Sequence, residues 1–295
     1  MLRAPSTKDE YRRQELAGLL RTRRARISPA EVGLNVAPGS RRRTPGLRRE
    51  DVAQLAGISS SLYTWLEQGR DIKTSRRVVD SISRVLKFDP TERRLFNELA
   101  LHGGSEEAES FVHSGREPWM EQLLDSLVEV PAFIMDSRWD ILHWNVAACA
   151  VVTDFSALSE KECNALWLMF MGPQFRRDLV DWETSAKAAL ARFRIDYGMH
   201  AGQKRFVELV DELLEASPEF RTWWSLHDLD APIVRQTRRF NPEFGELVLD
   251  HVYLQFRHAR DLTLTMFHAD EENRARIRAA IRSYRERSQA TPRHA

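Results

Sequence analysis

The sequence predicts a multidomain protein in which an all-α N-terminal domain precedes an α+β domain with an antiparallel sheet. Apolar residues recur at helical spacing through residues 12–101, whereas short runs with β character follow Trp119. The balance of basic and acidic residues along the chain changes at the same place. Residues 1–103 carry 21 lysines and arginines against 12 acidic residues, although the whole chain of 295 residues has a net charge of only +1. The basic half is therefore expected to contact a polyanion.

Five helices are predicted in residues 1–103. The first runs from about Arg12 to Arg26, where leucines recur along one face. An exposed basic loop follows, because two Pro-Gly pairs bracket Arg41, Arg42 and Arg43.

A helix, a tight turn and another helix follow in LRREDVAQLAGISSSLYTWLEQGR. Gly57 stops the first of these helices and Ser59 caps the second. Ala53, four residues before the glycine, lets the two helices cross closely. Fourth and fifth helices are predicted over 75–86 and from Thr91 onward.

Residues 104–117, rich in Gly, Ser and Glu, are expected to link this domain to a second domain over 118–270. The second domain should begin with a helix and a hairpin and end in three strands, with helices covering one face of the sheet. The expected strands are 132–135, 139–144, 233–240, 247–256 and 262–267. An arginine-rich segment over 271–295 is expected to form a solvated helix with a modest docking stripe, with a dimer contact or phosphate binding as alternatives.

The helix pair predicts DNA binding, because small polar side chains near the start of a second helix reach base edges while basic residues contact phosphate. The expected DNA-binding residues are Arg41, Arg42, Arg43, Arg48, Arg49, Ser59, Ser60, Ser61, Thr64, Trp65, Gln68 and Arg70. A plain helical hairpin, and a solvated surface for the arginine run, are the alternatives that the pattern leaves open.

Two parts of the chain resemble known regulators. RRRTPGLRREDVAQLAGISSSLYTWLEQGR resembles the Cro/repressor-type (XRE) helix-turn-helix of bacterial regulators. PAFIMDSRWDILHWNVAA, DWETSAKAALARFR, SPEFRTWWSLHDL and FNPEFGELVLDHVYL resemble, in order, their MmyB-like ligand-binding domain. The resemblance implies a five-helix lambda-repressor-like domain and a PAS-like sensor domain whose relatives bind a fatty-acid-like apolar molecule. The arginine-rich segment from Asn273 departs from the family's usual end.

The C-terminal half holds seven of the eight tryptophans and is expected to form a small-molecule pocket, although a close-packed core would use the same residues. An arginine would pair with a ligand carboxylate, and DWETSAKAALARFR, one of the segments that resemble the family, supplies two arginines. The expected ligand-binding residues are Phe133, Met135, Trp144, Asn145, Phe170, Trp182, Arg192 and Arg194. Asn145 can equally cap the helix that follows it.

Several function classes are not expected. No run approaches the roughly 18 apolar residues of a membrane span, and the N-terminus lacks the apolar segment of a secretory signal. Cys149 and Cys163 lack C-x-x-C spacing, which excludes a cysteine-built zinc site, and are expected to be reduced and buried. No phosphate-loop, nucleophile or zinc-protease motif occurs, which argues against an enzyme.

These observations predict a cytoplasmic transcription regulator that binds a double-stranded DNA operator as a homodimer and senses a small apolar, fatty-acid-like ligand. No cofactor, metal or catalytic residue is expected. Two alternatives remain open: the C-terminal domain is a protein-interaction module, or it is a small-molecule enzyme.

Overall fold

The structure, a computed structural model, describes residues 7–34, 46–101, 118–200, 202–228, 234–241, 244–257, 259 and 261–290. Contacts divide the chain into two compact units. Unit 1 contains Met1–Ala108, Arg194–Asp211 and Thr222–Leu229. Unit 2 contains Glu109–Phe193, Glu212–Arg221 and Asp230–Ala295.

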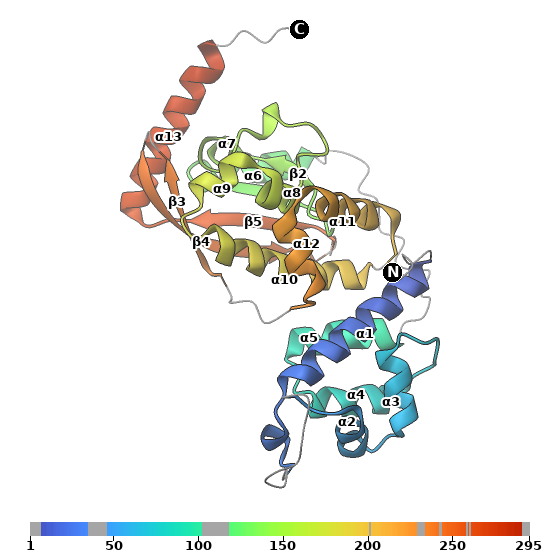
Figure 1. Cartoon of the computed structure of the whole chain (residues 1–295). Coiled ribbons are helices and arrows are strands. Elements are labelled where there is room, and N and C mark those ends of the chain that lie inside the picture. The colour runs from blue at the N-terminus through green and yellow to red at the C-terminus, as the bar shows by residue number, and fades with distance from the viewer. Residues whose placement is uncertain are drawn as a thin grey trace. The chain divides into compact units, whose positions relative to one another are not determined.

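The five predicted N-terminal helices are confirmed in unit 1 (Figure 1). They are α1 (Lys8–Arg26), α2 (Arg49–Ala56), α3 (Ser60–Glu67), α4 (Arg76–Val85) and α5 (Pro90–Leu101), with a 3₁₀ helix at Pro29–Val32. Helix α1 begins earlier than the apolar pattern predicts, because the Thr7 side chain accepts a hydrogen bond from the Glu10 amide at 3.2 Å and caps it.

One apolar cluster holds these helices together. Each helix contributes a side chain with no exposed surface: Leu20, Val52, Tyr63, Ile82 and Phe96. Burial of each such side chain contributes roughly 1.5–3 kcal/mol. The helical stripes read from the sequence are therefore the core of this bundle.

The rest of the described chain combines helices with one sheet (Figure 1). The helices are α6 (Pro118–Ser126), α7 (Val146–Val151), α8 (Ala165–Met171), α9 (Pro173–Asp178), α10 (Trp182–Met199), α11 (Lys204–Ala216), α12 (Pro218–Ser225) and α13 (Glu271–Ala290), with a 3₁₀ helix at Phe155–Ala157. The strands are β1 (Ala132–Met135), β2 (Ile141–Trp144), β3 (Gln236–Asn241), β4 (Gly245–Gln255) and β5 (Thr263–His268). All neighbouring pairs are antiparallel, in the order β2-β1-β5-β4-β3.

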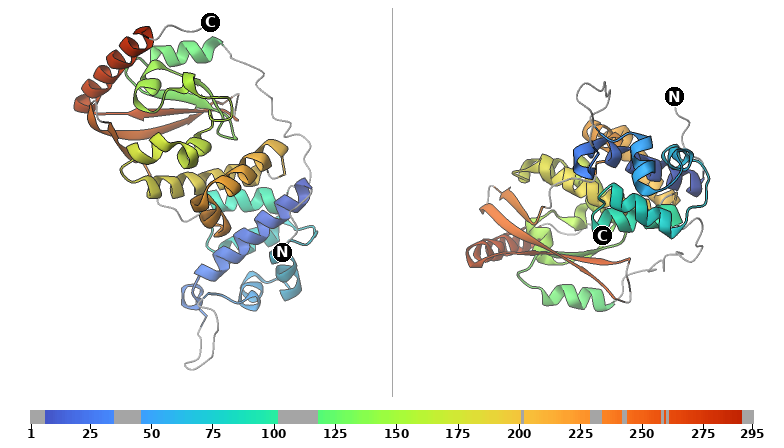
Figure 2. Two further views of the ribbon diagram at one scale, coloured as in Figure 1. Left: turned by 45° about the horizontal axis from the view of Figure 1, so that its top comes forward. Right: turned by 90° about the horizontal axis from the view of Figure 1, so that it is seen from below.

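Helices contact both faces of this sheet, so the prediction of one covered face was wrong. Ile134 packs with Met120 and Leu124 of α6, whereas the next residue towards the N-terminus, Phe133, contacts Phe155 on the opposite face. Figure 2 shows α6 on one side of the sheet and the first half of α10 on the other. Helix α6 takes this place because its methionine and leucine stripe must be buried.

The predicted strand at 139–144 is shorter in the structure. Trp139 has a positive φ of 69°, which a strand does not allow, and it belongs to the turn between β1 and β2. Strand β2 therefore begins at Ile141.

Within unit 2, helix α13 packs closely against the sheet. Ile277, Ala280 and Ile281 are buried in one cluster with Leu247 and Leu249 of β4. The docking stripe predicted from the sequence is confirmed, and it is deeper than the one expected of a solvated tail.

Candidate DNA-binding and ligand-binding sites

The helix-turn-helix is formed as the sequence predicts. Gly57, in the left-handed conformation with φ 65°, ends α2, and its amide donates to the carbonyls of Ala53 and Gln54. The Ser59 side chain accepts from the Leu62 amide at 3.1 Å and so begins α3. Glycine adopts this conformation without strain, which makes the turn tight.

Helix α3 separates a core face from an exposed face. Tyr63 and Leu66 are buried, whereas the side chains predicted to read DNA lie outside. Ser60, Ser61, Trp65 and Gln68 are exposed and Thr64 is half-buried. The exposed face is therefore polar, apart from the Trp65 ring.

Several predicted DNA-binding residues also have structural contacts. The Arg48 amide donates to Asp51 Oδ2 at 2.8 Å, while the Arg49 guanidinium pairs with Glu67. The Arg70 guanidinium lies 5.9 Å from the centre of the Trp65 ring. The predicted basic loop with Arg41, Arg42 and Arg43 lies outside the described residues.

Glu67 is a residue that the sequence analysis missed. Its side chain is completely buried at the end of α3, where one carboxylate oxygen lies 2.6 Å from Arg24 Nε and the other binds Arg49. These ion pairs tie α3 to α1 and α2. Its position four residues after the buried Tyr63 is the pattern that could have placed it on the core face.

In unit 2 we call the sheet face that carries Phe133, Leu249 and Thr265 the inner face. Phe133 and Tyr253 lie directly opposite Thr265 on the neighbouring strands, and opposed residues of an antiparallel pair point to the same face. Leu249, His251 and Tyr253 share this face because side chains alternate along a strand.

The predicted aromatic ligand-binding residues form two groups. Phe133 and Trp144 lie 5.8 and 5.4 Å from Phe155, measured between ring centres. Phe170 lies 6.2 Å from Trp182 and belongs to a second group that includes Phe220. Met135 is buried. A ligand contact for these side chains stays a prediction.

Asn145 has the capping role that the sequence left open. Its Oδ1 accepts from the amides of Ala148 at 2.9 Å and Ala132 at 3.1 Å. Its Nδ2 donates to the carbonyls of Leu127 and Val130, each at 2.8 Å. The asparagine thus begins α7 and fixes the segment before β1.

The two predicted arginines of α10 have different surroundings. Arg194, in unit 1, is buried, stacks on Trp224 at 3.8 Å and approaches Glu15 Oε2 at 3.3 Å. Arg192, in unit 2, lies 4.5 Å from the centre of the Trp139 ring and 4.0 Å from that of Tyr253. Only Arg194 has a carboxylate partner among the described residues.

A strip of polar side chains crosses the inner face, and the sequence analysis missed it. It consists of Thr237, Arg239, His251 and Tyr253. His251 is hydrogen-bonded to Thr237 Oγ1 through Nε2 and to the Tyr253 hydroxyl, at 2.8 Å, through Nδ1. Burial, together with the positive charges of Arg192 and Arg239, lowers the pKa of His251 to about 4. The imidazole is therefore neutral at physiological pH.

Arg239 is the most deeply buried charge of this strip. Its guanidinium donates to the Val152 carbonyl at 2.9 Å and lies 3.7 Å from Asp178 Oδ2. Burial lowers its pKa to about 10. Its Nε has no hydrogen-bond partner in the described part of unit 2.

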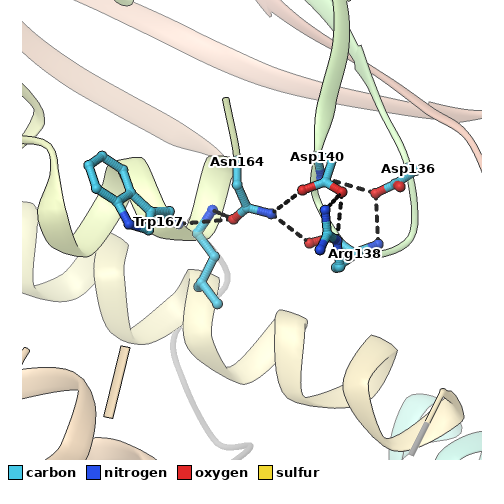
Figure 3. A network of polar contacts seen from close by, with 6 residues as sticks. Asp136, Arg138, Asp140, Asn164 and Trp167 are labelled. Carbon is cyan, nitrogen blue, oxygen red and sulfur yellow. Dashed lines mark hydrogen bonds and ion pairs between the residues drawn. The ribbon is translucent and has the colours of Figure 1, made fainter. Parts of the chain in front are cut away.

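A network of polar contacts fixes the turn between β1 and β2 (Figure 3). Asp136 Oδ1 accepts from the backbone amides of Arg138 at 2.9 Å and Asp140 at 3.0 Å. Asn164 Nδ2 donates to the Arg138 carbonyl and to Asp140 Oδ1, both at 2.9 Å. Burial and the Asp140 charge raise the pKa of Asp136 to about 6. This network encloses Trp139, whose left-handed backbone is one of the strained conformations that tightly held sites maintain.

The described residues contain no cluster of three His, Cys, Asp or Glu residues that could hold a metal ion. Within the same residues, no helix combines the length and apolarity needed to cross a membrane. Cys149 and Cys163 are free and buried, as predicted.

Comparison with known families assigns both parts of the chain. Residues 117–280 match the MmyB-like transcription regulator ligand binding domain, a match that extends into α13. Residues 15–96 match a helix-turn-helix domain. A search of curated proteins found no match.

Proposed function

The chain belongs to the family of MmyB-like transcription regulators, and from this membership we propose that it is a one-component regulator that binds an operator and responds to a fatty-acid-like ligand. The two matched domains support a ligand-sensing transcription regulator. The operator contacts, the ligand class and the oligomeric state are the parts that we propose.

The exposed face of α3 supports operator recognition. Thr64 lies on α3, and Gln68, the residue that caps the end of α3, follows one turn later; both point away from the buried Tyr63 and Leu66. In helix-turn-helix proteins this face enters the major groove, and Gln side chains read adenine edges there. Homodimerisation is proposed because such motifs pair two half-sites about one helical turn apart.

The inner face of unit 2 supports an apolar ligand. Phe133, Met135 and Phe155 are buried on or beside it, and aromatic and methionine side chains of this kind typically line sites for apolar molecules. The resemblance to MmyB-like sensor domains implies relatives that bind fatty-acid-like molecules. The long alkyl chain of such a molecule would pack against an apolar surface of this kind.

The exposed face of α3 is the main observation behind the proposal of operator binding, and DNA selection tests it. Operator fragments would be selected from random duplexes with the full chain, and affinities for the selected and a shuffled duplex measured by fluorescence anisotropy. Thr64→Ala and Gln68→Ala should each reduce the discrimination between the two duplexes by about 1–3 kcal/mol. Gln14→Ala, at an exposed glutamine of α1, is the matched control and should bind as the wild type. Unchanged discrimination in both α3 variants would mean that another surface reads the DNA.

The response to ligand is measured on the same operator with tetradecanoic acid. Coupling between two sites typically changes affinity by about 5–150-fold, so a shift in that range is expected. Equal operator affinity with and without the acid, despite binding of the acid, would remove it as an effector. Sedimentation of the protein with the operator gives the stoichiometry, and one protomer on a complete operator would exclude the dimer.

A further inference from the structure

The two compact units divide the chain differently from the two family matches. Residues Arg194–Asp211 and Thr222–Leu229 lie inside the ligand-binding match at 117–280, yet they belong to unit 1 together with helices α1 to α5. We call them the sensor segments. Helix α10 begins in unit 2, and from Arg194 onward it belongs to unit 1. Part of the sensor sequence is therefore built into the unit that contains the helix-turn-helix.

One face of α1 receives the sensor segments. It is formed by residues that recur at intervals of three or four along the helix, next to the leucine stripe of the bundle core: Glu15, Gly18, Thr22 and Arg26. The Thr22 hydroxyl donates to the Leu226 carbonyl at 3.5 Å. The Arg26 guanidinium lies 2.6 Å from a carboxylate oxygen of Asp228. The sensor segments thus follow the length of this face.

Glu15 lies at the centre of the contact. Its Oε2 is 3.3 Å from Arg194 Nη1, and its Oε1 is 3.8 Å from His227 Nε2. The Arg194 side chain is only 3% exposed, and its guanidinium stacks on the Trp224 ring and donates to the Trp224 carbonyl. Burial lowers the pKa of His227, so its imidazole is neutral at physiological pH and Glu15 offsets the charge of Arg194.

Gly18 lets the sensor segments approach α1 unusually closely. A Cβ atom at this position would lie 2.2 Å from His227 Cδ2, far inside van der Waals contact. Glycine leaves room for the imidazole, although it weakens a helix interior relative to alanine. Gly198 of α10 meets α5 in the same way, since a Cβ atom there would lie 2.6 Å from Leu95 Cδ1. Helix-weakening glycines therefore occur where the sensor segments touch the DNA-binding helices.

The rim of the contact is polar and partly open to water. The side chains of Arg26 and Asp228 are 33% and 45% exposed, so their ion pair adds little stability. His227 has a positive φ of 50°, which is uncommon for a residue other than glycine. Contacts of this kind resemble those between domains of one chain, which release more easily than a hydrophobic core.

The residues at the centre of this contact form what we call the α1 joint: Glu15, Gly18, Arg194 and His227. We propose that the α1 joint makes the sensor segments part of the cooperative unit that binds the operator. The inference rests on the proposed operator binding and adds the place at which the sensor regulates it. Coupling between two sites is reciprocal, so an operator that stabilises the sensor segments is bound more tightly when those segments are held in place. A change in α10 reaches the joint along one continuous helix, because Arg194 directly follows Phe193 of unit 2.

Hydrogen exchange of the full chain with and without the selected operator tests this joint. At an operator concentration of a hundred times Kd, bound DNA slows the exchange of whatever unfolds together with the DNA-binding helices by up to about a hundredfold. In the wild type, peptides that cover α3 and peptides that cover 222–228 should both exchange about tenfold to a hundredfold more slowly with the operator. Peptides from β5, in unit 2, should not change.

Gly18→Ala separates the joint from the DNA-binding surface. Alanine raises the helix propensity of α1, so the variant should fold, but its Cβ atom displaces the His227 ring from Glu15. The operator should still slow exchange in α3, whereas its effect on peptides 222–228 should fall to less than about threefold. Gln14→Ala, at an exposed position of the same helix, is the matched control and should behave as the wild type.

A charge exchange at the rim supplies a rescue. Arg26→Asp and Asp228→Arg should each reduce the effect of the operator on peptides 222–228 by about twofold to fivefold, as expected for a partly exposed ion pair. The double variant restores opposite charges and should recover most of the effect. A role of Arg26 in DNA binding alone would leave the double variant as weak as Arg26→Asp.

The outcomes are distinguishable. If the operator slows exchange in α3 of the wild type but not in 222–228, the joint is refuted while operator binding stands. If it slows no peptide, operator binding is refuted and this inference with it. An unchanged effect on 222–228 in Gly18→Ala would refute the joint. An equal loss in α3 and in 222–228 would place Gly18 in the DNA-binding surface and would refute it as well.

Discussion

Replacing Glu67 with glutamine tests how the helix-turn-helix keeps its shape. Glu67 is fully buried at the end of α3, and its two carboxylate oxygens bind the guanidinium groups of Arg24 in α1 and Arg49 in α2. Glutamine has nearly the same size, but its neutral amide has only one acceptor oxygen. At least one guanidinium therefore loses its partner, without a cavity being formed.

The expected loss of stability is about 3 kcal/mol. Removing one partner of a buried ion pair costs roughly 3–5 kcal/mol, because the other charge remains desolvated. The Arg24 side chain is 16% exposed and fits this case, but that of Arg49 is 41% exposed, so water compensates for most of its loss. Arg24 also keeps a hydrogen bond to the Leu47 carbonyl at 2.7 Å, which favours the lower end of the range.

Hydrogen exchange followed by mass spectrometry measures this loss on the full chain. In peptides that cover α2 and α3, a loss of about 3 kcal/mol corresponds to exchange that is roughly a hundredfold faster. Glu50→Gln, at an exposed glutamate in the first turn of α2, removes the same charge and should cost no more than about 1 kcal/mol. The reasoning fails if exchange in Glu67→Gln is no faster than in this control.

Three further predictions concern DNA, ligand and pH. Replacing Arg41, Arg42 and Arg43 together with alanine should weaken binding to all duplexes and flatten the salt dependence of log K by about 0.9 per lost phosphate contact; an unaltered slope would make the loop a solvated surface. Met135→Trp should abolish the response of operator affinity to tetradecanoic acid while DNA binding persists, and a normal response would place the ligand elsewhere. Burial and nearby positive charge lower the pKa of His251 from 6.5 to about 4, so the unfolded chain binds the proton more readily than the folded chain. The contribution of the neutral imidazole to stability is therefore present above pH 6.5 and is lost as the pH falls towards 4. Melting temperatures between pH 7 and 4.5 should therefore fall less steeply in His251→Gln, and parallel curves would contradict the assignment.

The N-terminal helices could be predicted because their determinants are local. Ser59 and Ser75 cap the helices that begin one residue later, and Gly57 ends α2 within the same short segment. The partners of Glu67 are not local, since Arg24 lies 43 residues before it. An apolar stripe indicates which face of a helix is buried, but it does not identify a charged residue on that face or its counter-ion.

The polar strip of the inner face could have been predicted in part. Leu247 and Leu249 are buried, and the two-residue period of a strand places His251 and Tyr253 on the same face. The strand residues expected at the ligand site were all apolar or aromatic, namely Phe133, Met135 and Trp144, whereas polar strand residues usually face water. The alternation of side chains along β4 was thus the available evidence for polar groups on the inner face, but it conflicted with the general rule that polar strand residues face water.

The register of the strands could not be read from the sequence, and it decides what the polar groups do. Thr265 meets Tyr253 because β5 pairs with β4 on one edge and with β1 on the other. The register therefore places on the inner face a buried hydroxyl that has no hydrogen-bond partner among the described residues, and such a group is unfavourable by about 1–3 kcal/mol.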